Sequence, residues 1–256
     1  MGILAVSLQS GSNGNCIYVE AGGAKLLFDA GIPGIRAQER LKAIGRDIRD
    51  VDALIISHEH SDHVLYAGVY HRKYGLPVYI SSATLEAALK RFPLGRLSDV
   101  NIFPVGGVLR FEGAAVRTVP TSHDAADGAA FVISSGQKGK RLGILTDLGH
   151  TFEGLPELAA TLDAVILESN FDPEMLRRGS YPAPLKRRIQ GPRGHLSNIE
   201  AAELLSCCRG LEWACLAHLS ENNNRPELAL KTHRAVNPSL PLHVAGRRAP
   251  SRVLKV

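Results

Sequence analysis

Short apolar runs separated by turn residues dominate this chain, and their lengths are typical of buried strands. In the first third, strands are expected at 3–8, 16–20, 25–31 and 51–56. Further strands are expected at 78–80, 101–103, 108–111, 115–120, 130–134, 142–146, 164–168, 213–217 and 242–245. The runs at 130–134 and 142–146 read as a hairpin around a turn at 136–139.

Helical spacing of apolar residues occurs between several of these runs. Helices are expected at 33–45, 64–74, 83–91, 198–208 and 226–235. Pro226 stands in the first turn of the last one, where a proline costs no backbone hydrogen bond. The pattern therefore predicts a mixed α and β protein.

The densest group of metal-binding side chains directly follows the apolar run 51–56. It consists of His58, His60, Asp62 and His63, which fall within six residues. Neutral imidazole and carboxylate ligands suit zinc, manganese or iron, and the run contains no thiolate. One histidine alone would be read as a surface or hydrogen-bonded residue, whereas this group predicts a metal site.

The spacing His58-x-His60-x-Asp62-His63 resembles the signature of the metallo-β-lactamase superfamily. The resemblance implies an α/β (α+β) fold, specifically a four-layer αββα sandwich that carries one or two metals. It also implies hydrolysis of an ester, thioester, amide or phosphodiester.

The resemblance further implies ligands at three later strand ends. His123 follows the strand 115–120, Asp147 follows 142–146, and His218 follows 213–217. For Asp147, capping of the next segment is the alternative. The expected ligands of two divalent ions (zinc, manganese or iron) are His58, His60 and His123 for one, Asp62, His63 and His218 for the other, and Asp147 as a bridge.

Asp29 ends another apolar strand, where a buried carboxylate needs a partner. It could accept the ring N–H of a ligating histidine and so fix that ligand's tautomer. Capping of the helix at 33–45 is the alternative. The superfamily carries a comparable strand-end aspartate, and this favours the first role.

Four longer passages resemble the YycJ/WalJ group of this superfamily. They lie at 10–16, 168–176, 181–198 and 218–229. The group's described activity implies a 5′-to-3′ exonuclease acting on DNA. Asn13 and the run Leu148-Gly149-His150 depart from the group's pattern, and neither touches an expected ligand.

The passage at 181–198 also suggests how an anion would be bound. Ser197 and Glu200 form a capping-box pattern that opens the helix 198–208 and places His195 just outside its N-terminus. Further candidates for binding phosphate are Ser10, Ser12, Asn13, Ser197, Asn198 and Asn222, although turn chemistry alone explains the loop 10–15. The basic residues expected to contact nucleic acid are Arg177, Arg178, Lys186, Arg187 and Arg188.

These residues predict two-metal phosphodiester hydrolysis. Asp62, through its metal ion, and His195 are the expected catalytic residues. The ions would lower the pKa of water, and His195 would stabilise the added charge or protonate the leaving group.

Composition is consistent with this reading. Of the 256 residues, 45% are hydrophobic and 21% charged, so we expect one soluble domain over 1–256. The net charge of +5 favours an anionic partner, here nucleic acid with DNA preferred. Four cysteines, no secretory signal and no apolar run long enough for a bilayer lead us to expect a cytoplasmic protein with no membrane contact.

Two other functions stay open at this stage. A small-molecule hydrolase acting on a thioester, lactone or cyclic phosphodiester would need a narrow closed pocket without basic residues at its entrance. A non-catalytic nucleic-acid-binding protein would lack ligands, and none is missing from the sequence.

Two other branches of the superfamily do not fit this sequence. A flavodiiron protein would carry glutamate in place of His60, and the roughly seventy residues between Asp147 and His218 are too few for the extra domain of the β-CASP nucleases.

Overall fold

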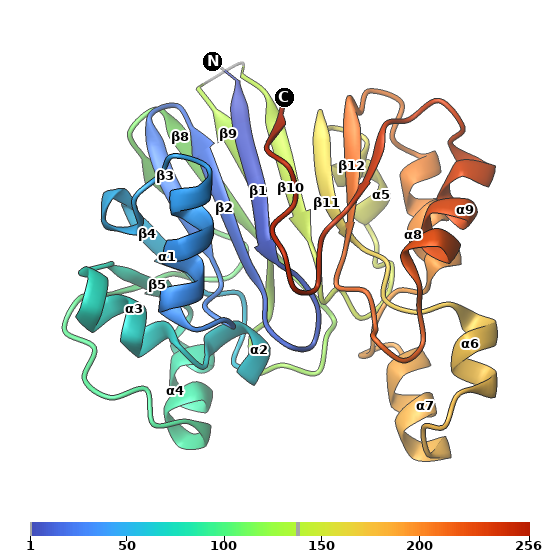
Figure 1. Ribbon diagram of the computed structural model, residues 1–256, viewed down its shortest axis with the longest axis horizontal. Helices are drawn as coiled ribbons and strands as arrows, with labels where there is room; N and C mark the ends of the chain where they lie inside the picture. Colours follow the sequence, from blue (N-terminus) through green and yellow to red (C-terminus); the bar gives the residue numbers. More distant parts are fainter. Residues whose placement is uncertain (1, 137–138) are drawn as a thin grey trace.

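The structure, a computed structural model, describes residues 2–136 and 139–256. Over these ranges the chain forms two seven-stranded sheets that pack face to face, with helices on both outer faces (Figure 1). The first sheet has the order β14-β1-β2-β3-β4-β5-β6, and the second has the order β13-β12-β11-β10-β9-β8-β7. This is the mixed α and β sandwich expected from the sequence.

The strand bounds follow the apolar runs closely. In the first sheet they are β1 Ile3–Gln9, β2 Cys16–Ala21, β3 Ala24–Phe28, β4 Ala53–Ile55, β5 Val78–Ile80, β6 Val100–Ile102 and β14 Leu254–Lys255. In the second they are β7 Val108–Phe111, β8 Ala114–Pro120, β9 Ala129–Ser135, β10 Arg141–Leu145, β11 Ala164–Glu168, β12 Trp213–Ala217 and β13 Leu242–Val244.

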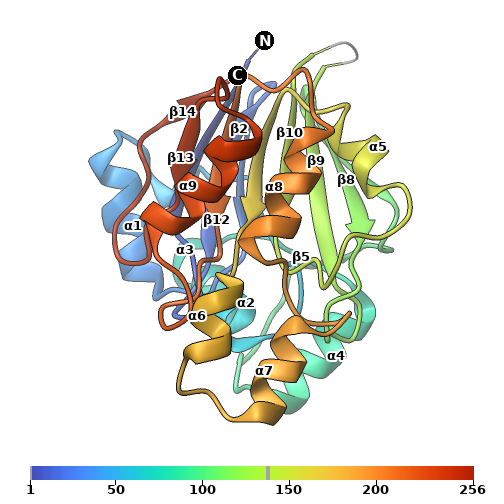
Figure 2. The ribbon, with the colours of Figure 1, turned by 90° about the vertical axis from the view of Figure 1, so that its right-hand side faces the viewer.

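The helices fall into three groups. Those beside the first sheet are α1 Gly34–Ala43, α3 Ala67–Tyr74 and α4 Ser82–Arg91, and those beside the second are α5 Leu155–Ala159, α8 Asn198–Ser206 and α9 Pro226–Val236 (Figures 1 and 2). Near one end of the molecule lie the short helices α2 Ser61–Val64, α6 Pro173–Arg178 and α7 Ala183–Gln190. No helix in the described ranges is long and apolar enough to cross a membrane.

Alternation along the buried strands divides the core into three layers. In β3, Leu26 and Phe28 point between the sheets, whereas Leu27 points toward the helices. In β11, Ile166 points between the sheets and Val165 points the other way. Because both faces are covered, these strands read as continuous apolar runs in the sequence.

The carboxyl ends of the central strands meet at one edge of the sandwich. Strands β3 and β4 are parallel, and so are β10, β11 and β12. Asp29 and His218 directly follow β3 and β12, and Asp147 lies two residues after β10; their φ angles are 65°, 53° and 54°, respectively. Non-glycine residues are rarely found in this left-handed region, and such strain concentrates at functional sites.

Three features were not predicted. The expected helix at 64–74 is split into α2 and α3, and the helices α5, α6 and α7 were missed. The basic end of the chain returns as β14 and pairs with β1. Two residues of the turn expected at 136–139, Gln137 and Lys138, lie outside the described residues. The single domain over 1–256 remains a prediction.

Three segments cross beside the first sheet: the loop before β2, the loop after β3, and α2. The Asn15 amide donates to the carbonyl of Asp62 at 2.7 Å, and the Gly31 amide donates to the carbonyl of Asn15 at 2.9 Å. A Cβ on Gly31 would lie 1.6 Å from the Asp62 carbonyl oxygen, so no side chain fits there. This crossing fixes α2, which carries Asp62 and His63.

Gly31→Ala should therefore destabilise the protein by about 3 kcal/mol or more, because backbone atoms must move to admit the methyl group. Gly210→Ala is the matched control, since the nearest atom to its Cβ is 4.0 Å away. Urea unfolding of both variants checks this. Equal midpoints for the two would show that the crossing tolerates displacement.

Candidate active site

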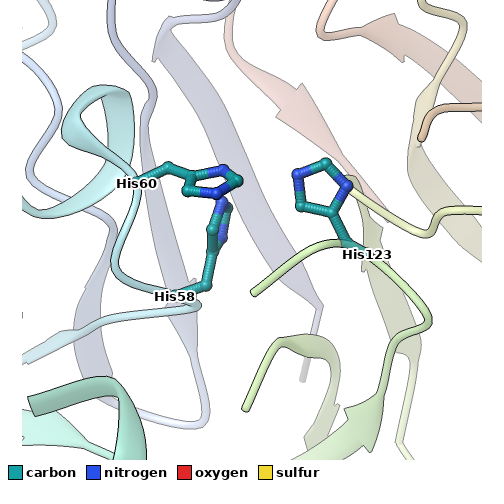
Figure 3. A group of neighbouring side chains, drawn as sticks. All are labelled: His58, His60 and His123. Carbon is teal, nitrogen blue, oxygen red and sulfur yellow. The ribbon is translucent and has the colours of Figure 1, made fainter. Parts of the chain in front are cut away.

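The first group of possible metal ligands joins the two sheets. His58 and His60 leave the end of β4, His123 follows β8, and one ring nitrogen from each lies within 4.8 Å of the others (Figure 3). The Nδ1 of His123 donates to the carbonyl of Gly194 at 2.8 Å, which leaves its Nε2 free to bind an ion. The Nε2 of His58 is buried and has no hydrogen-bond partner in the described part of the chain.

The second group lies beside the first. It consists of Asp62, His63 and His218, whose ligand atoms also fall within 4.8 Å of one another. The Nε2 atoms of His63 and His218 each lie 3.5 Å from Asp62 Oδ2. This is longer than a good charge-assisted hydrogen bond, and it leaves space for a shared ion.

Asp147 stands between the two groups. Its Oδ1 lies 3.8 Å from His123 Nε2, and its Oδ2 lies 3.4 Å from His63 Nε2. Its Oδ2 is buried without a hydrogen-bond partner among the residues described. A carboxylate placed in this way can bind an ion on each side.

The charges of this cluster favour positively charged groups. Burial alone would lower the pKa of His218, but Asp147, Asp62 and Glu168 outweigh burial and raise it to about 10. The pKa of His63 is likewise raised well above its usual value, against burial, by Asp29, Asp147 and Asp62. Divalent ions would displace these protons and also pair the orphaned nitrogen and oxygen atoms. The residues present therefore fit divalent metal ions.

His58 behaves differently from the other two. Burial, together with the neighbouring histidines His63, His60 and His123, lowers its pKa well below the usual value. Its imidazole is consequently neutral, which is the form that binds a metal.

Asp29 contacts the candidate ligand His63 directly. Its Oδ2 accepts from the Nδ1 of His63 at 2.7 Å, and its Oδ1 accepts from the Ser57 amide at 2.8 Å. This fixes the His63 tautomer with Nε2 toward the cluster. The helix α1 begins instead after Pro33, without a side-chain cap.

The pair Glu168 and His195 completes the cluster, and sequence reasoning missed the glutamate. Glu168 ends β11, is fully buried, and accepts from the Nδ1 of His195 at 2.6 Å. Burial would raise the pKa of Glu168, but His195 and His218 hold it well below its usual range. A carboxylate at the end of a buried strand was the signal that could have identified it, as for Asp29.

A cavity of about 410 Å³ opens over this cluster. His60, Asp62, His123, Asp147, His195 and His218 contribute to its lining. Other lining residues, to which the sequence analysis assigned no role, are Ser61, Arg91, Phe92, Asn170, Tyr181, Leu185, Ile189 and Ser220. Its volume is within the range of about 300–1,000 Å³ typical of ligand sites.

Among the phosphate candidates, Ser12 alone lines this cavity. Ser10 is buried, and its hydroxyl oxygen accepts from the His218 amide at 2.7 Å, so it positions a ligand. Asn13 exchanges hydrogen bonds with Arg247, through the latter's carbonyl and guanidinium, both at 3.0 Å. These two side chains have partners other than a substrate.

The polar side chains at the N-terminus of α8 also hydrogen-bond within the protein. Ser197 and Glu200 form the capping box, and the buried Asn198 amide group donates to Asn224 at 3.0 Å. Asn222 donates to the Tyr181 hydroxyl at 3.0 Å. None of these three phosphate candidates lines the cavity over the described residues, whereas His195, just before α8, does.

The five basic candidates for contacting nucleic acid differ in their position relative to the cavity. Arg177 and Arg178 pair with Glu174 on their own helix, and Lys186 donates to the carbonyl of Arg177. Of the five, Arg188 lines the cavity.

A buried polar network supports the loop after β11. The Ser169 hydroxyl donates to Asn198 Oδ1 at 2.7 Å and accepts from His233 Nε2 at 3.1 Å. The neighbouring Asn170 lines the cavity and donates to the His218 carbonyl at 2.8 Å. His233 on α9 is fully buried, and burial lowers its pKa to about 4.

Comparison with known proteins gives one family. The sequence profile described as Metallo-beta-lactamase superfamily matches residues 10–156. The exodeoxyribonuclease WalJ of Streptococcus pneumoniae serotype 2 (strain D39 / NCTC 7466) is 38% identical over 229 residues, which are 88% of this chain and 84% of that protein. The exodeoxyribonuclease YycJ of Bacillus anthracis is 37% identical over 231 residues, 90% of this chain and 87% of that protein.

A solved structure gives the same fold. The metallo-beta-lactamase fold protein YhfI of Bacillus subtilis superposes with a TM-score of 0.75 and 17% identity, and the match covers 100% of both chains. At this identity the likeness concerns the fold alone.

Removing one ligand from each group should lower metal content. We expect His58→Ala and His218→Ala each to lose about one bound ion per chain, because the remaining ligands are too few to hold it. His243→Ala, a histidine of β13 away from the site, is the control. Elemental analysis after dialysis against zinc or manganese gives the result. Unchanged metal content in both variants would contradict the ligand assignment.

The His233 network should make stability depend on pH. Its pKa falls from 6.5 to about 4 on folding, so between these values the unfolded chain takes up a proton that the folded chain does not. Stability is therefore full above about pH 6.5 and falls as the pH drops toward 4, by up to about 3 kcal/mol. His233→Gln keeps a donor without titrating, and urea unfolding at pH 7 and pH 4.5 should show a smaller loss. Identical losses in both proteins would refute this.

Proposed function

The chain belongs to the metallo-beta-lactamase superfamily, and from this premise we propose that it is a two-metal phosphodiesterase that degrades DNA as an exonuclease, 5′ to 3′. Relatives named exodeoxyribonucleases match most of its length. The observation that carries the proposal is that residues of both metal-binding groups, His195 and two arginines line one cavity, with the buried Glu168 bonded to His195 behind it.

The ligand set suits two divalent ions. When bound, such ions polarise phosphoryl oxygens and lower the pKa of water. Zinc, manganese or iron fits ligands of nitrogen and oxygen. The residues that would hold them are His58, His60 and His123 for one, Asp62, His63 and His218 for the other, and Asp147 for both.

The chain's own contribution is to fix ligand tautomers and move a proton. Asp29 and the Gly194 carbonyl hold the ring protons of His63 and His123 away from the cluster. Glu168 accepts the Nδ1 proton of His195, so the Nε2 of His195 can act on the substrate. In its protonated form, His195 gives the Nε2 proton to the leaving oxygen, and Glu168 stabilises the charged ring beforehand.

The substrate is a polyanion in this proposal. A small-molecule hydrolase was expected to have a closed pocket without basic residues, whereas Arg91 and Arg188 line this cavity. Contacts to phosphates carry no base information, so we expect little sequence preference and a strong dependence on salt. The cytoplasmic location remains a prediction.

The direct test uses metal-loaded protein with single- and double-stranded DNA and RNA, labelled at either end. We expect mononucleotides to be released from the 5′ end of DNA, no activity in Asp147→Ala, and a rate that falls steeply with salt. Internal cleavage, or hydrolysis of RNA alone, would contradict the proposal.

His195→Ala separates proton transfer from metal binding in the same assay. Turnover should fall about 10²–10³-fold with metal content unchanged, since an electrostatic and acid catalyst is lost while the ligands remain. His150→Ala is the matched control, because His150 Nδ1 donates to the Pro192 carbonyl outside the cavity lining of the described residues. Loss of metal in His195→Ala would instead make His195 a ligand.

A further inference from the structure

Two arginines from separate helices line the cavity over the metal cluster. Arg91 is the last residue of α4, beside the first sheet, and Arg188 lies in α7, beside the second. The two helices lie at the same end of the molecule (Figures 1 and 2). One ligand in the cavity can therefore contact a guanidinium from each half of the fold.

Each arginine is held by a carboxylate next to a metal-binding histidine. Glu59, between His58 and His60, is 2% exposed, and its Oε1 lies 3.5 Å from Nη1 of Arg91. Asp124 follows His123, and its Oδ2 accepts from Nε and Nη2 of Arg188 at 2.7 and 2.6 Å. The loops that position the metal ligands thus also position both cations.

Both guanidinium groups keep donors available. Their side chains are 52% and 59% exposed for Arg91 and Arg188, respectively. Arg91 has one ion-pair partner within the described ranges, Glu59, and Arg188 uses Nε and Nη2 on Asp124. An arginine has five N–H donors in a planar fork that matches a phosphate, so each can bind one.

Apolar side chains flank the two cations. Leu185 and Ile189 are one helical turn apart on α7 and line the cavity, although α7 has no buried residue. Phe92 follows Arg91 and lines it too. A ligand that alternates anionic groups with flat apolar ones suits such a surface, and a nucleic acid strand has this structure.

Neighbouring cations on the same helices have other surroundings. Lys90 pairs with Glu86, and neither Lys90 nor Arg187 lines the cavity in the part of the chain described. All four residues are positively charged, but only Arg91 and Arg188 of these four lie at the cavity.

We infer that Arg91 and Arg188 form a two-point clamp for backbone phosphates of the substrate strand, on either side of the metal centre. The inference rests on the proposed function for the nature of the substrate. Arg91 is a residue that the sequence did not indicate, and Arg188 is the one of the five basic candidates to which the structure assigns this role.

The test compares Arg91→Ala and Arg188→Ala with Lys90→Ala and Arg187→Ala, all as metal-loaded full chains. For DNA, each clamp variant should raise KM about tenfold, keep kcat within about threefold, and make the salt slope of kcat/KM shallower by about one. Hydrolysis of bis(4-nitrophenyl) phosphate, a small diester with no strand, should not change. The Lys90 and Arg187 variants should match the wild type in all three.

Two further measurements separate binding from damage to the site. Arg91→Lys and Arg188→Lys keep the charge and should give intermediate KM values, because the planar fork is lost. Metal content should equal that of the wild type in every variant. A fall in metal content, or slower hydrolysis of the small diester, would show a structural role and overturn the clamp.

Binding of labelled phosphorothioate DNA keeps the two proposals distinct. If the wild type cleaves DNA while clamp and control variants bind and cleave equally, the clamp fails alone. If the wild type does not cleave DNA but its binding depends on Arg91 and Arg188 and not on Lys90 and Arg187, the nuclease proposal fails and the clamp stands. Absence of binding by the wild type would overturn both.

Discussion

The structure depends on balancing buried negative charge at the edge where the two sheets meet. Asp29, Asp147 and Glu168 each stand at or just after the end of a buried strand, and Asp62 joins them from α2. A carboxylate out of water is costly unless it is paired. Backbone amides and imidazoles satisfy part of this requirement, and the carboxylates raise the pKa of His63 and His218 against the effect of burial. The affinity for cations is thus a consequence of the same arrangement that completes the fold.

The geometry of this edge is maintained against local conformational preference. Asp29, Asp147 and His218 adopt left-handed backbone conformations that cost about 1–3 kcal/mol each when nothing else compensates. The crossing of the loops at Asn15, Gly31 and Asp62 holds part of this backbone in place. The polar network of Ser169, Asn198 and His233 holds another part from the opposite sheet.

The sequence predicted what depends on contiguous residues. Buried strands are continuous apolar runs, and the four candidate ligands from His58 to His63 lie together in the chain. Polar residue type alone predicted phosphate-binding side chains less well. Ser197 and Asn198 were expected to bind phosphate, but local capping and a buried network use their hydrogen bonds. Arg91 could not be predicted, since its position depends on how the end of α4 packs beside Glu59. The short helix α7 buries no residue and so leaves no core periodicity to detect.

The ligand set is divided between the two sheets, and this division orders events during synthesis. His58, His60, Asp62 and His63 leave the ribosome roughly 150 residues before His218, a delay of about 8–30 s at about 5–20 residues per second. During that interval the nascent chain has only part of the proposed ligand set, so an ion that it met would be held weakly. The set is complete only when β12 docks. The chain would therefore acquire its full complement of ions late, once the second sheet has formed.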